Sequence, residues 1–475
     1  FFALIFLLVT GVFGMFVALD LFFIFVWFDV SLFPMYLLIA IWGSTRKEYG
    51  AMKLTLYLLA GSALILPGMI YLFVQSELST FNVITLMQPD LFTPFQQKFA
   101  FLLFYIGFGI LAGVWPFHTW SPVGHVAAPT GVSMIHAGVL MKIGAFGVLR
   151  VGMFLCPEGW HYWADLMALL ATSGIVYGAF VGLTQTDLKY VIGYSSVSHM
   201  GIVGLGLATM TADGLNGAVY QMFAHGIMTA LFFSSVGYIY DRTHTKAIAE
   251  LGGLSRTLPR ASSFFILAAL TGIGVPCLAS FWGELVVFLS AVKVFPLYGA
   301  LVVLALVISA LFMLRVVQKT CYGPPIERYK GLPDMTPGLM VPRLILATVI
   351  VFFGLFPGAL FETINSAAIP FIKSWEPSAK AQAVGAPVEV NVAKLQPGQL
   401  LKVQWRGQTI GVLKRTPAML ERLPEVDPTA HSRTGSSENQ TVSSRRGRSS
   451  PRPRRARCRA ASPNPYCLRA SVCPS

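Results

Sequence analysis

The sequence has little charge for its length. Asp, Glu, Lys and Arg make up 12% of its 475 residues, whereas 55% of the residues are apolar. Soluble globular domains carry about 25% charged residues, and their helices are usually apolar on one face only. Because the apolar segments of this chain are apolar all round, we exclude a soluble all-α protein.

Cysteine is scarce too, and its spacing excludes several kinds of site. A disulfide framework or a metal centre needs paired or closely spaced cysteines, and no two of the six form a CxxC pair. No G-x-G-x-x-G follows a predicted strand, so we expect no NADH- or flavin-binding site. We therefore predict that this chain holds no cofactor and no metal. The cysteines are Cys156, Cys277, Cys321, Cys458, Cys467 and Cys473.

Long apolar runs are the dominant feature of the sequence. Runs of about 20 residues recur from Phe2 to Leu360, and a helix of that length crosses about 30 Å of hydrocarbon. They predict an all-α polytopic membrane protein with about eleven transmembrane helices. The runs lie near residues 2–18, 20–42, 54–74, 99–116, 130–153, 162–183, 189–207, 214–239, 262–292, 297–319 and 341–361.

The formal net charge of +14 does not indicate a nucleic-acid partner. From Lys373 onward there are 18 Lys and Arg against 6 Asp and Glu, which leaves a net charge of +2 for residues 1–372. In the membrane part, the loops near residues 46–53, 242–260 and 319–343 are basic and share one side. By the positive-inside rule this side, which includes Phe1, is cytoplasmic.

The composition changes abruptly after the last apolar run. Residues 363–430 contain alternating segments that predict strands, at 388–392 and 400–405, with a turn at 406–407. Residues 431–475 are rich in Arg, Ser and Pro and have little to bury, so we expect a disordered or out-of-frame tail. The first of these segments resembles the neck of a bacterial Rieske iron–sulfur protein without its cluster-binding motifs.

The stretch at residues 115–150 carries the strongest functional signal. It contains three prolines and three histidines (His118, His125 and His136) and then a single lysine, Lys142, deep inside an apolar segment. A lysine at the bilayer centre costs about 3 kcal/mol on insertion scales, and such a residue is a candidate for proton or ion transfer. Broken helices beside such a residue are typical of membrane proteins in which the break lines a water-filled cavity.

Further ionisable residues recur in the apolar segments that follow. Lys189 and His199 belong to one predicted helix, in Q-T-D-L-K-Y-V-I-G-Y-S-S-V-S-H-M-G. His225 lies in Q-M-F-A-H-G, and Glu284 follows a Pro- and Gly-interrupted segment in S-F-W-G-E-L-V-V-F. Each has a structural alternative: Lys142 could reach a membrane surface, and Glu284 could cap the second half of a broken helix.

These blocks are similar to the antiporter-like, proton-translocating subunits of respiratory complex I, and most of all to the M-type subunit. The resemblance covers about residues 1–362 and depends on F-H-T-W, H-V-A-A-P-T, A-G-V-L-M-K and Y-S-S-V-S-H-M-G. It implies an antiporter-like domain whose first three of fourteen helices are missing here. It also implies two discontinuous helices, near Val114–Pro129 and Val275–Gly283.

The resemblance implies a proton-translocating membrane-arm subunit of an NADH:quinone oxidoreductase in a bacterial inner membrane. Its partners would be other membrane-arm subunits, the lipid bilayer and protons, and the redox reaction would occur in other subunits. Lys142 matches the central lysine of the family's proton channel, and Glu284 matches the exit-side acid. Lys189 matches an entrance position and His225 a central histidine, with His199 as a further candidate.

The sequence departs from the family at one charge pair. Asp29 stands where the family has a glutamate, and Leu111 stands where its lysine partner is expected. His136, six residues before Lys142, is a candidate substitute, but α-helical spacing puts the two on different faces.

Two alternatives stay open. A cation/proton antiporter subunit of the Mrp type, or a membrane-hydrogenase subunit, shares these helix blocks. The second alternative is a structural subunit of the membrane arm that does not pump protons, because the lysine expected at position 111 is missing.

Overall fold

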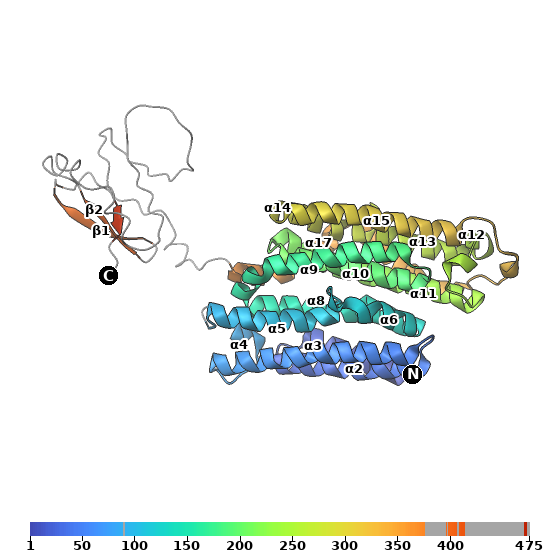
Figure 1. Ribbon diagram of the computed structural model, residues 1–475, viewed down its shortest axis with the longest axis horizontal. Coiled ribbons are helices and arrows are strands. Elements are labelled where there is room, and N and C mark those ends of the chain that lie inside the picture. The colour runs from blue at the N-terminus through green and yellow to red at the C-terminus, as the bar shows by residue number, and fades with distance from the viewer. Residues whose placement is uncertain (89–90, 376–395, 397, 406–407, 414–469, 473–475) are drawn as a thin grey trace, which may run out of the picture. The chain divides into compact units, whose positions relative to one another are not determined.

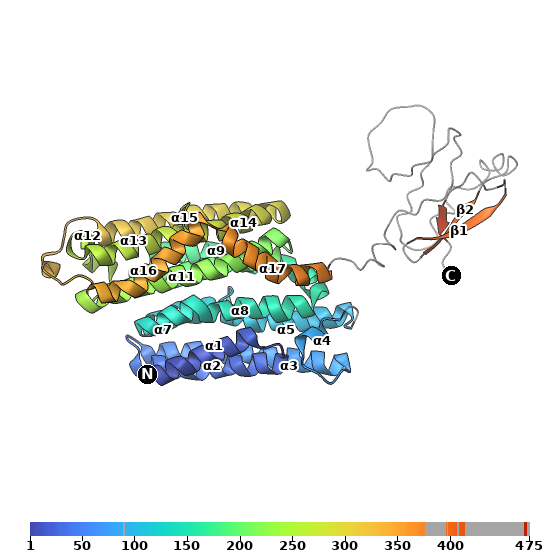
Figure 2. The ribbon, with the colours of Figure 1, turned by 180° about the vertical axis from the view of Figure 1, so that it is seen from behind.

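A computed structural model describes the chain except for residues 89–90, 376–395, 397, 406–407, 414–469 and 473–475. The chain divides into two units, Phe1–Lys373 and Ser374–Ser475. The described part of the first unit is helical, and its long helices run nearly parallel to one another (Figures 1 and 2).

The first half of the helical unit runs from α1 to the segment that carries Lys142. Helices α1 to α3 lie along one side of Figure 1, next to α5 and α8. Two π-helices, η2 and η3, flank α8. The elements are α1 (Phe2–Val17), α2 (Leu21–Trp42), α3 (Lys47–Ser76), α4 (Val83–Leu86), α5 (Pro94–Ala112), η1 (Phe117–Thr119), α6 (Trp120–Ala127), α7 (Thr130–Ile135), η2 (His136–Leu140), α8 (Met141–Gly147) and η3 (Val148–Met153).

The second half packs around α10 and α11. Helix α10 lies between α9 and α11, and α11 also contacts α13, α14 and α16. The elements are α9 (Pro157–Thr184), α10 (Leu188–Ala208), α11 (Ala212–Thr243), η4 (Ile248–Glu250), α12 (Leu254–Thr257), α13 (Pro259–Ile273), α14 (Ala279–Val294), α15 (Pro296–Cys321), η5 (Glu327–Tyr329), α16 (Pro337–Leu355) and α17 (Gly358–Trp375).

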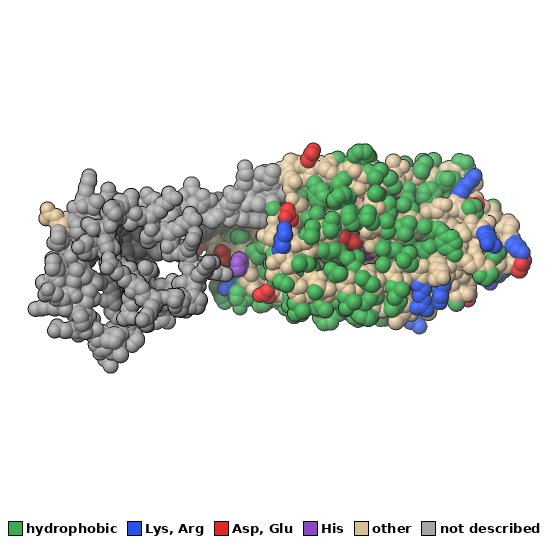
Figure 3. Space-filling model, turned by 90° about the horizontal axis from the view of Figure 1, so that it is seen from above, with side chains coloured by type: hydrophobic (Ala, Val, Ile, Leu, Met, Phe, Trp, Pro, Cys, Tyr) green, Lys and Arg blue, Asp and Glu red, His purple; other side chains and the backbone are tan. Residues whose placement is uncertain are grey.

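The prediction of an all-α polytopic membrane protein is confirmed. Among the described residues, nine helical segments are long and apolar enough to cross a membrane. The run at 2–18 forms the shorter helix α1, of 16 residues, and the run at 262–292 is divided between α13 and α14. On the face seen in Figure 3, apolar side chains cover the middle of the helical unit, and charged side chains lie mostly toward its ends.

Both expected discontinuous helices are present. Helix α5 ends at Gly113, with φ +76°, before η1 and α6 continue the span. Helix α13 ends at Gly274, with φ +77°, before α14 begins. Glycine adopts this left-handed conformation without the steric cost that a side chain brings. Both breaks therefore begin with a glycine in the left-handed backbone conformation.

The second unit contains a short antiparallel sheet. Strand β1 (Leu400–Trp405) pairs with β2 (Gln408–Leu413), with Trp405 opposite Gln408, and β2 pairs with β3 (Ala470–Val472). A strand was expected at 400–405. The expected strand at 388–392, the turn at 406–407 and most of the 431–475 tail lie outside the described residues, so the predicted domain division stays a prediction.

We expect Gly274→Ala to destabilise the helical unit by about 1–3 kcal/mol, because a side chain in this backbone conformation is strained. The new Cβ would also lie 2.3 Å from Oε2 of Glu284. The melting temperature of the purified protein measures the loss. Gly131→Ala is the matched control, because nothing lies within 4 Å of its added Cβ. Equal melting temperatures for the two variants would contradict this explanation.

Candidate functional site

Lys142 forms the centre of the site. It lies in α8 with 5% of its side chain exposed. Its Nζ donates a hydrogen bond to the carbonyl oxygen of Ala137 and lies 2.6 Å from Nδ1 of His225 on α11. Two basic nitrogens at this distance need a proton between them. The side chain is thus directed toward His225 rather than toward a membrane surface.

The close contact of Lys142 and His225 depends on two glycines. A Cβ on Gly226 would lie 2.6 Å from the carbonyl oxygen of Gly138, and 3.9 Å from Cε of Lys142. The backbones of α11 and η2 therefore touch directly at this level. Because no side chain separates them, the lysine on the following helix can reach the histidine.

His199 and Glu284 form the second pair of the site. His199 Nδ1 lies 2.7 Å from the carbonyl oxygen of Ser195, which can only accept, so Nδ1 carries a proton. Nε2 lies 3.2 Å from the carbonyl oxygen of Gly272 and 3.3 Å from Oε1 of Glu284. The Gly272 carbonyl oxygen also can only accept, so the contact as it stands is imidazolium with carboxylate; the second state, neutral imidazole with carboxylic acid, leaves the Gly272 oxygen without this donor. The two states differ only in the position of one proton.

Glu284 is positioned by neighbouring helices and does not cap its own. It lies five residues after the start of α14 and is 3% exposed. Gln221 on α11 donates from Nε2 to Oε1 of Glu284 at 3.2 Å. The absent side chain at Gly274 leaves room for the carboxylate. The alternative of a helix cap therefore does not describe this residue.

The rings of His225 and His199 connect the two pairs. Their centroids are 5.0 Å apart, and Nε2 of His225 is buried with no hydrogen-bond partner among the described residues. Lys142, His225, His199 and Glu284 therefore follow one another across α8, α11, α10 and α14. Each member can accept and release a proton.

Lys189 lies beside the end of α6, apart from this series. It is buried, and its Nζ donates to the carbonyl oxygen of Ala128 at 2.8 Å. The Asp187 side chain accepts from the backbone N–H groups of Lys189 and Tyr190 and so caps α10. The amine of Lys189 thus binds a carbonyl at the point where α6 ends.

Asp29 has a different partner from the one that the resemblance implies. Its Oδ1 accepts a hydrogen bond from Oγ of Ser62 on α3 at 2.8 Å. Leu111 is buried in α5 and offers no charge. In the described part of the chain no ion pair involves Asp29.

Several parts of the site were not predicted. Gln221 lies four residues before His225 on the same face of α11, and that spacing is a signal that was available. No comparable spacing in the sequence indicates the π-helices η2 and η3. In the described ranges, no group of three or more His, Cys, Asp or Glu is placed to hold a metal.

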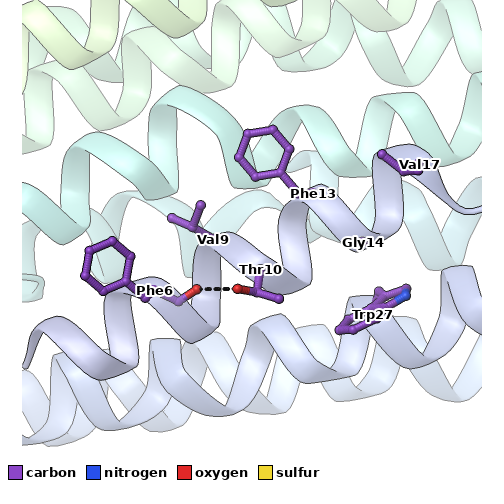
Figure 4. A pocket seen from close by; sticks show the side chains of 7 residues that line it. All are labelled: Phe6, Val9, Thr10, Phe13, Gly14, Val17 and Trp27. Atoms are coloured by element: carbon purple, nitrogen blue, oxygen red, sulfur yellow. Dashed lines mark hydrogen bonds between the residues drawn. The ribbon is translucent and has the colours of Figure 1, made fainter.

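Residues of α1 and Trp27 of α2 line a groove (Figure 4). The Thr10 hydroxyl donates to the carbonyl oxygen of Phe6, and Gly14 lies against the ring of Trp27. None of the residues that line the groove is titratable, so we assign it no part in proton transfer. They are Phe6, Val9, Thr10, Phe13, Gly14, Val17 and Trp27.

Comparison with known proteins places this arrangement in a family. Residues 18–311 match the family described as NADH:quinone oxidoreductase/Mrp antiporter, TM. The chain belongs to this family. NADH-quinone oxidoreductase subunit M of Rickettsia prowazekii is 34% identical over 357 residues, which are 74% of this chain and 72% of that protein. The NAD(P)H-quinone oxidoreductase chain 4 1 of Synechococcus sp. is 35% identical over 413 residues, 84% of this chain and 78% of that one.

Chains of two solved complexes share the fold. A chain of respiratory complex I from Thermus thermophilus is 28% identical, with a TM-score of 0.72 over 78% of this chain and 79% of that chain. A chain of the Mrp complex from Dietzia sp. has a TM-score of 0.71 at 21% identity, covering 80% of this chain and 79% of that one, and shows the fold alone. The resemblance to antiporter-like subunits is confirmed. The Rieske-like resemblance of residues 363–430 stays a prediction.

We expect Gly226→Ala to lower stability more than Gly138→Ala. The added Cβ at 226 would lie 2.6 Å from a carbonyl oxygen, whereas the one at 138 would lie 3.3 Å from the carbonyl oxygen of Gly226. Overpacking of this kind costs about 1–3 kcal/mol, and it would separate Lys142 from His225. Melting temperature and proton transport, measured on both variants, check the order. The reverse order would contradict a direct backbone contact.

Proposed function

We propose that this chain is a proton-translocating membrane-arm subunit of an NADH:quinone oxidoreductase in a bacterial inner membrane. The named relatives are subunits of such oxidoreductases. The series of contacts from Lys142 through His225 and His199 to Glu284 is the observation that supports the proposal best. Other membrane-arm subunits, lipid and protons are its partners, and we assign it no nucleic-acid partner.

Proton movement along the series needs only small shifts of position. A proton between Lys142 and His225 can be bound more tightly by either nitrogen, since each is basic. The same holds for the contact of His199 with Glu284. Moving one proton from Glu284 to His199 creates an ion pair, which changes the electrostatic field at the neighbouring His225 ring. The position of the proton in the His199–Glu284 pair therefore influences the position of the proton in the Lys142–His225 pair.

Lys189 and Asp29 serve this function from outside the series. Lys189 lies beside the end of α6, on the side predicted to be cytoplasmic, where a proton can enter. Asp29 binds Ser62 instead of a cation. We therefore propose that it contributes less to proton translocation than the four central residues do. The redox reaction belongs to other subunits of the complex, and this chain contributes no redox cofactor.

We expect Lys142→Ala to abolish most of the proton translocation that this subunit contributes, while the complex still assembles. The variant removes the amine that shares a proton with His225. Glu284→Gln should have a similar effect, because it keeps the shape of the side chain and removes its charge. The ratio of protons translocated to electrons transferred, measured in membrane vesicles, tests both. An unchanged ratio in both variants would support a structural subunit instead.

Asp29→Asn should reduce the proton-to-electron ratio less than Lys142→Ala does. The amide of the new side chain can still accept a hydrogen bond from Ser62 through its oxygen, and in the described structure Asp29 has no cationic partner to lose. The same vesicle assay compares the two variants. If Asp29→Asn stops translocation as fully as Lys142→Ala, the carboxylate takes part in the central series. Sodium-dependent transport by the unmodified complex would instead favour a cation/proton antiporter.

A further inference from the structure

A groove on the exposed side of α15 gathers basic and polar side chains near the end of that helix. Helix α15 lies at the edge of the helical unit (Figures 1 and 2). Arg315, Gln318, Lys319 and Tyr322 line the groove, and all four are exposed. They are three or four residues apart, so they share one face of the helix. These four residues form the basic face of α15.

The opposite face of α15 fixes the helix in place. Phe312 and Met313 are buried, and the ring of Phe312 lies against Gly182 of α9. Where the helix ends, the hydroxyl of Ser255 donates to the carbonyl oxygen of Cys321 at 2.6 Å. The basic face is therefore positioned before any ligand binds, and a preorganised site binds its ligand at a smaller entropic cost.

The two cations of the basic face lack an anion. Arg315 and Lys319 are one helical turn apart, and like charges at this spacing destabilise a helix. Neither side chain forms an ion pair with another described residue. A guanidinium group binds phosphate oxygens in pairs, and a lysine adds a second positive charge. The hydroxyl of Tyr322 and the amide of Gln318 can donate further hydrogen bonds. The face therefore fits one phosphate group.

The basic face lies at the level that lipid headgroups occupy along α15. The 18 residues from Leu297 to Leu314 carry no charge. At 1.5 Å per residue they cover about 27 Å, close to the roughly 30 Å of hydrocarbon in a bilayer. Arg315 is the next residue, and tyrosine, as at position 322, is enriched at this level. The loop that follows is on the side predicted to be cytoplasmic, where the membrane surface is negatively charged.

An exposed apolar stripe continues from the basic face into the hydrocarbon region. Its residues are each more than half exposed, and they are Leu304, Val307, Leu311 and Leu314. Leu311 and Leu314 also line the groove. From Leu304 to Leu314 the helix rises about 15 Å, which is half of the hydrocarbon thickness and so the depth of one leaflet. The groove therefore offers an apolar surface for an acyl chain directly beside the site for a phosphate.

We propose that the basic face of α15 binds one anionic phospholipid of the cytoplasmic leaflet. Arg315 and Lys319 bind its phosphate, and one of its acyl chains lies along the apolar stripe. A headgroup that carries its own ammonium, as in phosphatidylcholine, is repelled by the two cations, whereas the headgroup of phosphatidylglycerol carries no positive charge. Because α15 contributes no residue to the series from Lys142 to Glu284, this inference does not depend on the proposed function.

Photo-crosslinking tests the site in the assembled complex. The complex is reconstituted in phosphatidylcholine vesicles with a small share of phosphatidylglycerol that carries a photoactivatable group in its acyl chain. We expect crosslinks within residues 304–314. Arg315→Gln combined with Lys319→Gln should lower their yield about 30-fold, because each basic side chain contributes about fivefold to binding at an anionic surface. NADH:quinone electron transfer reports assembly. Where the double variant does not assemble, Lys319→Gln alone replaces it, with a loss of about fivefold expected.

Arg46→Gln combined with Lys47→Gln is the matched control. It removes two positive charges from the same predicted side of the membrane, but at the start of α3. We expect the yield of crosslinks on α15 to stay at the wild-type level. Lys319→Arg keeps the positive charge and should keep the yield as well. An equal loss in the control and in the α15 variant would show that the charge of the whole surface attracts the lipid, and would contradict a site on α15.

Three further results would overturn the inference. Equal crosslinking by a phosphatidylcholine probe would show that the acyl chain binds without the phosphate contacts. Loss of the crosslinks on addition of inorganic phosphate, but not of chloride at the same ionic strength, would make free phosphate the ligand. If an amine-reactive crosslinker joins Lys319 to another subunit and the lipid probe gives no product, a protein covers the groove instead.

Discussion

The contact between Lys142 and His225 is the interaction on which the rest of the helical unit depends. An amine in the interior of a membrane protein is costly to charge, and it persists only where other groups compensate for that cost. Here the compensation comes from a histidine nitrogen 2.6 Å away and from the Ala137 carbonyl group. The direct approach of Gly138 and Gly226 makes that geometry possible. Substitution at either glycine therefore affects chemistry as well as packing.

The two broken helices supply what unbroken helices cannot. A continuous helix satisfies its own carbonyl groups, whereas a break releases some of them for other partners. At the first break the Ile110 carbonyl group accepts a hydrogen bond from Nε1 of Trp120. At the second break Gly274 leaves space that the Glu284 carboxylate occupies. Both breaks begin with a left-handed glycine, but the first positions the indole ring of Trp120 and the second the carboxylate of Glu284.

Much of the fold could be predicted because its signals are local. Apolar length indicated the spans, and the prolines and glycines near residues 113–129 and 274–278 indicated the breaks. Lys142 stood out because no other lysine lies so deep within an apolar segment. The partnership of His199 with Glu284 was not predictable, since the two are far apart in sequence and nothing in either segment specifies the other. The argument that His136 and Lys142 lie on different faces assumed 3.6 residues per turn, and the π-helix between them changes that register.

The π-helices have a geometric consequence for α8. A π-helical turn contains about one residue more than an α-helical turn, and α8 lies between two such segments, η2 and η3. Transferring the extra residue from η2 to η3 would turn α8 by about 100° and slide it along its axis by about 1.5 Å. The helices beyond, α7 and α9, would keep their positions. The two π-helical segments therefore set which neighbours Lys142 faces, in a segment whose Gly144 and Gly147 lie directly against α5.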